Sequence, residues 1–150
     1  MNSLQINSIL SKNHNTKKLF KGVYGSDTIK QFHTYPPYTL VVNTQKISQP
    51  GEHWVGIYVK NANDIEYFDS FGEPPNNEIQ KFTKNFKNIK INSKKLQSDF
   101  DTSCGPFVIY FIIQRSRGRN FDTIVNHLSD PYNDSFVKMF IFKMIAGGNV

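Results

Sequence analysis

An uninterrupted apolar segment, residues 107–113, constrains the fold of this chain more than any other feature. The segment has no polar face, so periodicity alone allows either a central strand or a buried helix. The residues before it, Ser103-Cys104-Gly105-Pro106, decide between the two. Proline is tolerated in the first turn of a helix and is excluded from a central strand. We therefore predict a buried helix whose first turn carries Cys104.

Two further patterns predict the sheet that this helix covers. Residues 38–43 form a β-branched run after two prolines, which favours a buried strand. Alternating residues on either side of the polar loop 61–63 predict a hairpin with strands over 53–59 and 64–69. Another short strand is expected over 88–92, and helices over 4–10, 77–88, 121–128 and 135–146. This order predicts a single α+β domain over 1–150, with helices packed on a small, mainly antiparallel sheet.

The composition excludes several classes of function. Hydrophobic residues make up 38% and charged residues 20% of the chain, which is enough for a core and unlike a disordered tail. No apolar run approaches the roughly 18–20 residues of a membrane span, and the first residues lack the layout of a secretory signal. The single cysteine excludes an intrachain disulfide, a multi-cysteine zinc site and an iron–sulfur cluster. We expect an intracellular or particle-packaged protein whose chemistry requires no metal and no organic cofactor.

Cys104 is the first candidate catalytic residue. At a helix N-terminus, unpaired backbone N–H groups and the helix dipole favour a thiolate over a thiol. An inert cysteine would more naturally lie within the apolar segment itself. Position alone leaves both interpretations open, a nucleophile or a core residue.

His53 and Asp69 are the candidate base and orienting group for such a nucleophile. Of the four histidines, only His53 begins a strand beside a turn, where a side chain can face a cleft. The three-residue loop pairs position 60 with 64, so 53 pairs with 71, and Asp69 lies diagonally from His53 on the same face. The alternative is a strand-end histidine and aspartate that make ordinary turn hydrogen bonds.

Gln97 is a candidate oxyanion donor. A thiolate that attacks a carbonyl needs hydrogen-bond donors directed at the developing negative charge. The backbone N–H of Cys104 is one such donor, and the side-chain amide of Gln97 is a candidate for the other. Taken in isolation, a glutamine in a polar stretch is more often a surface residue.

Together these segments resemble the adenovirus-type cysteine endopeptidases, the adenain family. The resemblance rests on Gly51-Glu52-His53-Trp54, Tyr67-Phe68-Asp69-Ser70-Phe71-Gly72, Gln97 and Ser103-Cys104-Gly105-Pro106-Phe107, in this order. Similar segments at 20–24 and 41–44 extend it over about residues 20–115. Related enzymes occur in virophages and virus-like transposons, and an AT-rich virophage such as mavirus would suit a chain rich in Asn, Lys and Ile. SUMO-specific proteases share the fold and the catalytic order more distantly.

The resemblance implies a papain-like fold with Cys104 as nucleophile, His53 as general base, Asp69 as orienting carboxylate and Gln97 as oxyanion donor. Trp54 would flank the histidine, although a lone tryptophan in a strand is more often a core residue. Three departures stand out. The acid is Asp where the adenovirus enzyme has Glu, the stretch before Gln97 is shorter, and the second cysteine that joins the adenovirus enzyme to its activating peptide is absent. A disulfide-linked activator is therefore excluded, whereas a noncovalent peptide activator is not.

Basic residues outnumber acidic ones. Eighteen Lys and Arg against twelve Asp and Glu give a formal net charge of +6. Many of them lie in two stretches: Lys81, Lys84, Lys87, Lys90, Lys94 and Lys95, and then Arg115, Arg117 and Arg119. A solvated face is the default interpretation. The resemblance implies instead that these residues contact DNA phosphates, because adenovirus-type proteases use DNA as a cofactor inside the particle.

These observations lead to one predicted function and two alternatives. We predict a viral maturation endopeptidase that cleaves capsid precursors after Gly-Gly-type sites through a thioester acyl-enzyme. We expect a monomer without membrane contact, located in the virion and the infected host cell. The alternatives are an isopeptidase that removes ubiquitin-like modifiers by the same chemistry, and a basic, nucleic-acid-binding virion protein in which Cys104 is inert.

The dipeptide Gly147-Gly148 near the C-terminus has two interpretations. Two glycines after a helical segment commonly end the helix. Residues 145–149 also resemble the adenovirus-type cleavage consensus, an aliphatic residue, any residue, and then Gly-Gly before the cut. This second interpretation predicts self-processing after Gly148.

Overall fold

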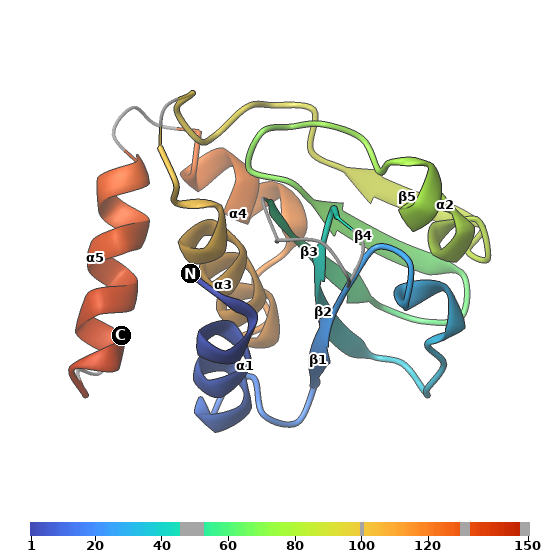
Figure 1. Ribbon diagram of the computed structural model, residues 1–150, viewed down its shortest axis with the longest axis horizontal. Coiled ribbons are helices and arrows are strands. Elements are labelled where there is room, and N and C mark those ends of the chain that lie inside the picture. The colour runs from blue at the N-terminus through green and yellow to red at the C-terminus, as the bar shows by residue number, and fades with distance from the viewer. Residues whose placement is uncertain (46–52, 100, 130–132, 148–150) are drawn as a thin grey trace.

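A five-stranded sheet with helices on both faces organises the molecule (Figure 1). The computed structural model describes residues 1–45, 53–99, 101–129 and 133–147. The strands lie in the sheet in chain order: β1 (Phe20–Tyr24), β2 (Tyr38–Asn43), β3 (Trp54–Val59), β4 (Asp64–Phe68) and β5 (Asn88–Ile91). The helices are α1 (Ser3–Lys12), α2 (Asn77–Thr83), α3 (Cys104–Ser116), α4 (Phe121–His127) and α5 (Asn133–Ile145), with a 3₁₀ turn η1 (Ile29–Gln31).

The sheet is mixed, with antiparallel pairs at its centre and parallel pairs at its edges. The β3–β4 pair is antiparallel, as the hairpin pattern predicted, and the β2–β3 pair is antiparallel as well. The β1–β2 and β4–β5 pairs are parallel. A parallel neighbour requires a crossover connection, and α2 supplies it between β4 and β5. The α+β fold class is confirmed.

The hairpin has the register that its short loop predicted. Val59 pairs with Ile65 and Gly56 with Phe68, so position 60 lies opposite 64. The backbone N–H of Lys60 donates to the carbonyl of Asp64 at 3.0 Å, which closes the loop. The ends of β3 and β4 that lie away from this loop are therefore brought together.

The apolar segment forms the central helix. Helix α3 begins at Cys104, and nearly all of its side chains up to residue 114 are buried. It packs on β3, where a Cβ at Gly56 would come within 3.1 Å of the Phe111 ring. The absence of a side chain at Gly56 lets the helix approach the sheet closely.

Two apolar clusters fill the two faces of the sheet. One lies under α1, α3, α4 and α5, and includes Phe107, Phe111 and Phe68. The other lies under α2 and η1 and includes Ile57 and Tyr67. In Figure 1, α1, α3 and α5 lie to the left of the sheet and α2 to the right.

Two predicted helices end as local chemistry requires. The helix expected over 77–88 ends at Thr83, because the side chain of Asn85 donates to the Phe82 carbonyl and the chain turns into β5. Phe86 still packs against the cluster that contains Phe82. Helix α5 ends at Ile145, and Gly147 adopts a φ of 84°, so the helix-stop interpretation is confirmed. The predicted self-processing site involves residues 148–150, which lie outside the described residues.

Within the described ranges, no helix is both long and apolar enough to cross a bilayer.

Candidate active site

Cys104 lies at the N-terminus of α3, where the sequence predicted it. Cys104 as a whole is 9% exposed. The loop that leads into it is fastened to α5, because Ser103 Oγ donates to Asp134 Oδ1 at 2.9 Å and Lys138 forms an ion pair with Asp101. The position of the thiol is therefore determined by both α3 and α5.

His53 and Asp69 form the predicted pair just beyond the ends of β3 and β4. His53 Nε2 lies 2.6 Å from Asp69 Oδ1, and the aspartate side chain is almost fully buried. The same oxygen accepts the backbone N–H of Phe71 at 2.8 Å. The side chain of Asn92 bonds to both the N–H and the carbonyl of Asp69, at 2.9 and 2.6 Å. The carboxylate thus orients the imidazole from a rigid position.

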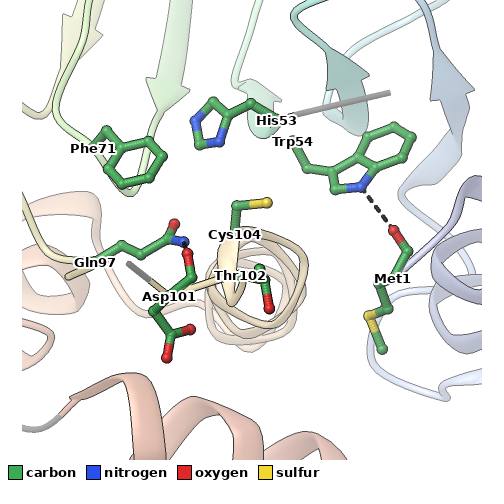
Figure 2. Close-up of a pocket in the computed structure, with 8 residues that line it drawn as sticks. All are labelled: Met1, His53, Trp54, Phe71, Gln97, Asp101, Thr102 and Cys104. Carbon is green, nitrogen blue, oxygen red and sulfur yellow. Dashed lines mark hydrogen bonds between the residues drawn. The ribbon is translucent and has the colours of Figure 1, made fainter. Parts of the chain in front are cut away.

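The second ring nitrogen of His53 is available to the thiol. Nδ1 is buried and makes no hydrogen bond of good geometry to any residue that the structure describes. The ring of Phe71 packs on the imidazole with centroids 4.8 Å apart, which restricts its rotation. In Figure 2 the Cys104 side chain rises from α3 toward the gap between His53 and Trp54. Catalytic hydrogen bonds are often loose before substrate binds.

The pKa values of these two groups shift in opposite directions. Burial alone would lower the pKa of His53, but the hydrogen bond to Asp69 and the nearby thiol outweigh it and raise this pKa to about 9. Burial alone would raise the pKa of the Cys104 thiol. The neighbouring imidazole and the backbone N–H groups of Trp54 and Gly105 outweigh it and lower this pKa below its ordinary value. Both shifts favour a thiolate–imidazolium pair near neutral pH.

His53 and Cys104 line a pocket of about 270 Å³ (Figure 2). Its lining residues are Met1, His53, Trp54, Phe71, Gln97, Asp101, Thr102 and Cys104. Gln97 is 2% exposed, so it is not the surface residue that its polar surroundings suggested. Its Nε2 donates to the carbonyl of Asp101 and its Oε1 accepts from Ser70 Oγ, both at 2.6 Å. The structure therefore brings together all four residues that the sequence singled out.

Trp54 satisfies both interpretations that the sequence left open. The residue is 7% exposed and belongs to the core cluster under α3. Its indole N–H donates to the carbonyl of Met1 at 3.0 Å, so the segment before α1 forms one wall of the pocket. Trp54 is a core residue and a pocket residue at once.

Several residues of the site are not apparent from local sequence patterns. Phe71 was within reach, because the predicted register already placed it opposite His53. Asn92, Ser70 and Met1 gave no local signal, since each acts on a residue distant in the chain.

One basic residue differs from expectation. Arg115 is not a solvent-facing cation: its Nε and Nη2 donate to the two carboxylate oxygens of Glu66 at 2.7 and 2.9 Å. Both side chains are only 10% exposed. Arg115 is therefore committed to the interior and is not placed to contact DNA.

The described residues hold no cluster of three His, Cys, Asp or Glu side chains arranged to bind a metal ion.

Comparison with known proteins gives similarity without a family assignment. No protein-family model matches the chain. R355 of Acanthamoeba polyphaga mimivirus, which carries the provisional description of thiol protease, is 33% identical over 99 residues, covering 58% of this chain and 32% of its own length. The cysteine protease S273R of African swine fever virus (isolate Tick/Malawi/Lil 20-1/1983) is 30% identical over 89 residues, covering 50% of this chain and 32% of its own length. The chain thus spans about a third of the length of these relatives.

Solved structures support the fold. The crystal structure of the African swine fever virus pS273R protease superposes with a TM-score of 0.64 at 17% identity, over 83% of this chain and 60% of that one. The central domain of the uncharacterized Lpg1148 protein from Legionella pneumophila gives a TM-score of 0.61 at 15% identity, over 98% of this chain and 96% of that one. This chain therefore has the α+β fold of a viral cysteine protease and a distant sequence similarity to viral thiol proteases.

Proposed function

We propose that this protein is a cysteine endopeptidase, with Cys104 as nucleophile, His53 as acid and base, Asp69 as orienting group and Gln97 as oxyanion donor. One observation carries the proposal: Asp69 binds Nε2 of His53 and leaves Nδ1 for a cysteine whose pKa is lowered. Similarity to two viral proteases points to the same reaction.

The proposed chemistry follows from these positions. The Cys104 thiolate attacks the substrate carbonyl carbon, and the electron pair of the C=O bond moves to oxygen, where Gln97 and the Cys104 backbone N–H donate. The His53 imidazolium protonates the leaving amine as the C–N bond breaks and a thioester forms. Water then attacks the thioester while neutral His53 takes its proton, and the carboxylic acid leaves with the thiolate restored.

The proposed substrates are viral capsid precursors cut after Gly-Gly-type sites. The pocket supports small residues next to the cut, because Trp54 and Met1 on one side and Phe71 on the other leave only about 270 Å³. The alternative, an isopeptidase that removes ubiquitin-like modifiers, would use the same chemistry on a different substrate. A non-catalytic virion protein would have no need of the lowered thiol pKa.

Regulation and setting are part of the proposal. We propose a virophage or virus-like transposon as the source, a monomer in the virion and the host cell, and DNA or a noncovalent peptide as activator. DNA would contact lysines of the α2–β5 segment such as Lys84 and Lys87, whereas Lys81, Lys90 and Lys95 form ion pairs with acidic neighbours. Activation that falls steeply with salt would support phosphate contacts.

Thiol reactivity tests the proposed function most directly. A dipyridyl disulfide should react with the wild-type protein at mildly acidic pH, well below the ordinary cysteine pKa of about 8.5, and not with Cys104→Ala. His53→Ala should move this reactivity to higher pH, because it removes the group that lowers the pKa. Co-encoded capsid proteins should then be cut by the wild type and not by Cys104→Ala, as read by mass spectrometry. A thiol that reacts only near pH 8.5, with no cleavage, would refute the proposal.

A further inference from the structure

The side-chain amide of Gln97 is fixed by two short hydrogen bonds. Its Nε2 donates to the backbone carbonyl of Asp101, and its Oε1 accepts from the hydroxyl of Ser70, both at 2.6 Å. Ser70 is fully buried and Gln97 is 2% exposed. Both ends of the amide are therefore engaged away from bulk water.

The partners determine which way the amide points. A backbone carbonyl can only accept, so the atom that faces Asp101 must be the NH₂ group. The atom facing Ser70 is then the amide oxygen, and the hydroxyl must donate to it. An NH₂ group has two hydrogens, so one N–H of Gln97 remains after the bond to Asp101. Gln97 lines the pocket that contains the thiol, and this second N–H is the one available there.

We propose that Ser70 is a positioning residue of the oxyanion hole. Its hydroxyl holds the amide oxygen of Gln97 and so aims the remaining N–H at the oxygen of a substrate carbonyl attacked by Cys104. This inference rests on the proposed function. A hydroxyl that donates to an amide oxygen also polarises the amide, which strengthens the N–H on its far side as a donor.

The chain position of Ser70 supports this role. Asp69 before it binds the His53 ring nitrogen, and Phe71 after it packs on the same ring. The backbone carbonyl of Ser70 also accepts the N–H groups of Leu96 and Gln97, at 2.8 and 2.9 Å. Three consecutive residues thus position both the base and the oxyanion donor.

The adjoining turn requires glycine. Gly72 adopts a φ of 73°, and a Cβ there would lie 2.9 Å from backbone atoms of Ser93 and Lys94. This close approach brings the 69–72 segment against the segment that leads to Gln97.

Ser70→Ala separates the hydroxyl from the backbone. The two backbone hydrogen bonds to the Ser70 carbonyl remain in this variant, so Gln97 keeps its place in the chain. Only the bond to Oε1 is lost, and the amide is left with a single restraint. We therefore expect a change in oxyanion stabilisation without a change in the thiolate–imidazolium pair.

The experiment combines three measurements on the wild type, Ser70→Ala, Gln97→Ala and the double variant. Peptide hydrolysis reports kcat and KM. Inhibition by a peptide aldehyde ending in glycine reports oxyanion binding, because the thiolate adds to the aldehyde carbon and places the negative charge on oxygen. Reaction with a dipyridyl disulfide at mildly acidic pH reports the thiolate alone, because that reaction develops no oxyanion. Ser129→Ala is a matched control, since its hydroxyl bonds to the Val125 carbonyl at 2.7 Å and it does not line the pocket.

Ser70→Ala should lower kcat and aldehyde affinity by about 10-fold, which is less than the roughly 10²–10³-fold cost of removing an oxyanion donor, because Gln97 keeps its bond to Asp101. KM and the disulfide reaction should stay within about 2-fold, because the lost interaction belongs to the transition state. In the Gln97→Ala background the same substitution should have almost no further effect. Ser70→Thr, which keeps the hydroxyl, should retain more activity than Ser70→Ala.

Two results would overturn the inference, and a third would overturn its foundation. If Ser70→Ala slows the disulfide reaction as much as it slows hydrolysis, Ser70 supports the Cys–His pair or the fold instead. If its effect persists undiminished in the Gln97→Ala background, it does not act through Gln97. If the wild type neither reacts at acidic pH nor cleaves peptide, the proposed function fails, and the role of Ser70 falls with it.

Discussion

Each end of helix α3 lies near an ion pair that includes a carboxylate of the segment 64–69, and the two pairs have different consequences. At the C-terminal end, Arg115 of α3 pairs with Glu66 through two hydrogen bonds, and its guanidinium lies 4.3 Å from the centre of the Tyr58 ring. At the N-terminal end, Cys104 lies beside His53, which Asp69 binds through one nitrogen only.

The difference lies in what remains unbound. Arg115 also donates to the Arg119 carbonyl, and hydrogen bonding to Glu66 raises its pKa further, so this pair is closed and permanently charged. The pair of His53 and Asp69 leaves Nδ1 of His53 without a hydrogen bond of good geometry in the described structure, and the pKa of His53 is about 9. A buried ion pair thus serves structure when its cation stays charged and is held by both carboxylate oxygens, and serves chemistry when a titratable nitrogen is left over.

The largest expected contrast is in turnover. Cys104→Ala should lower peptide cleavage by about 10⁴-fold or more, because it removes the nucleophile. Arg115→Met should leave kcat within a few-fold at a temperature where both variants are folded. Steady-state hydrolysis with circular dichroism as a folding check measures both. Substantial cleavage by Cys104→Ala would show that Cys104 is not the nucleophile, and the chemical role of the His53–Asp69 pair would fall with it.

The ion pair between Glu66 and Arg115 should act mainly on the free energy of unfolding. Glu66→Gln leaves the buried Arg115 without its counter-charge, and breaking such a pair costs about 3–5 kcal/mol in the free energy of unfolding. Glu78→Gln is the matched control, since its ion pair with Lys81 is solvent-exposed and is worth about 0–1 kcal/mol. Urea denaturation gives both values. Equal small losses in the free energy of unfolding for Glu66→Gln and Glu78→Gln would show that the buried Arg115 pair stabilises the fold no more than an exposed pair does.

Asp69→Asn should be milder than Cys104→Ala or His53→Ala. We expect a fall of about 10²-fold in kcat, because Phe71 still packs on the imidazole while the charge that orients and stabilises it is lost. The pKa of His53 should drop, so the alkaline limb of the pH–rate profile should move from about pH 9 to lower pH. An unmoved alkaline limb would show that Asp69 does not set the charge of His53.

The smallest effect is a pH dependence of stability. The folded pKa of His53, about 9, lies above its ordinary value of 6.5, so its stabilising contribution is complete below about pH 6.5 and is lost as the pH rises through about 9. A Cys104→Ala background removes the titration of the thiol and also its contribution to the raised pKa of His53, so the loss should be centred below pH 9 there. In this background His53→Gln should lower Tm by a few degrees at pH 6 and by less at pH 9.5. Arg115→Met should show no such convergence over this range, since the guanidinium stays charged. Calorimetry measures all of these shifts.

The pairing of His53 with Asp69 was predictable from the sequence, and the pairing of Glu66 with Arg115 was not. The loop of three residues fixed the hairpin register, and a two-residue period then placed Asp69 on the face of His53. Proline after Cys104 placed the thiol at a helix N-terminus. These inferences depend on short-range rules that hold wherever the chain folds.

The remaining contacts join segments with no local relation. Glu66 and Arg115 are separated by 49 residues, and Ser70 and Gln97 by 27. Nothing in the neighbouring residues indicates which carboxylate a buried arginine will meet. The parallel strand β1 and the wall formed by Met1 depend in the same way on tertiary packing.

The hydrogen bond between Trp54 and Met1 also equips the molecule with an optical probe. Trp54 is the only tryptophan of the chain, so all indole fluorescence originates at the rim of the candidate active site. Its emission should respond to ionisation of the adjacent thiol, to protonation of His53 and to any peptide that displaces water from the pocket. Unlabelled protein can therefore report its own pocket occupancy in a stopped-flow instrument.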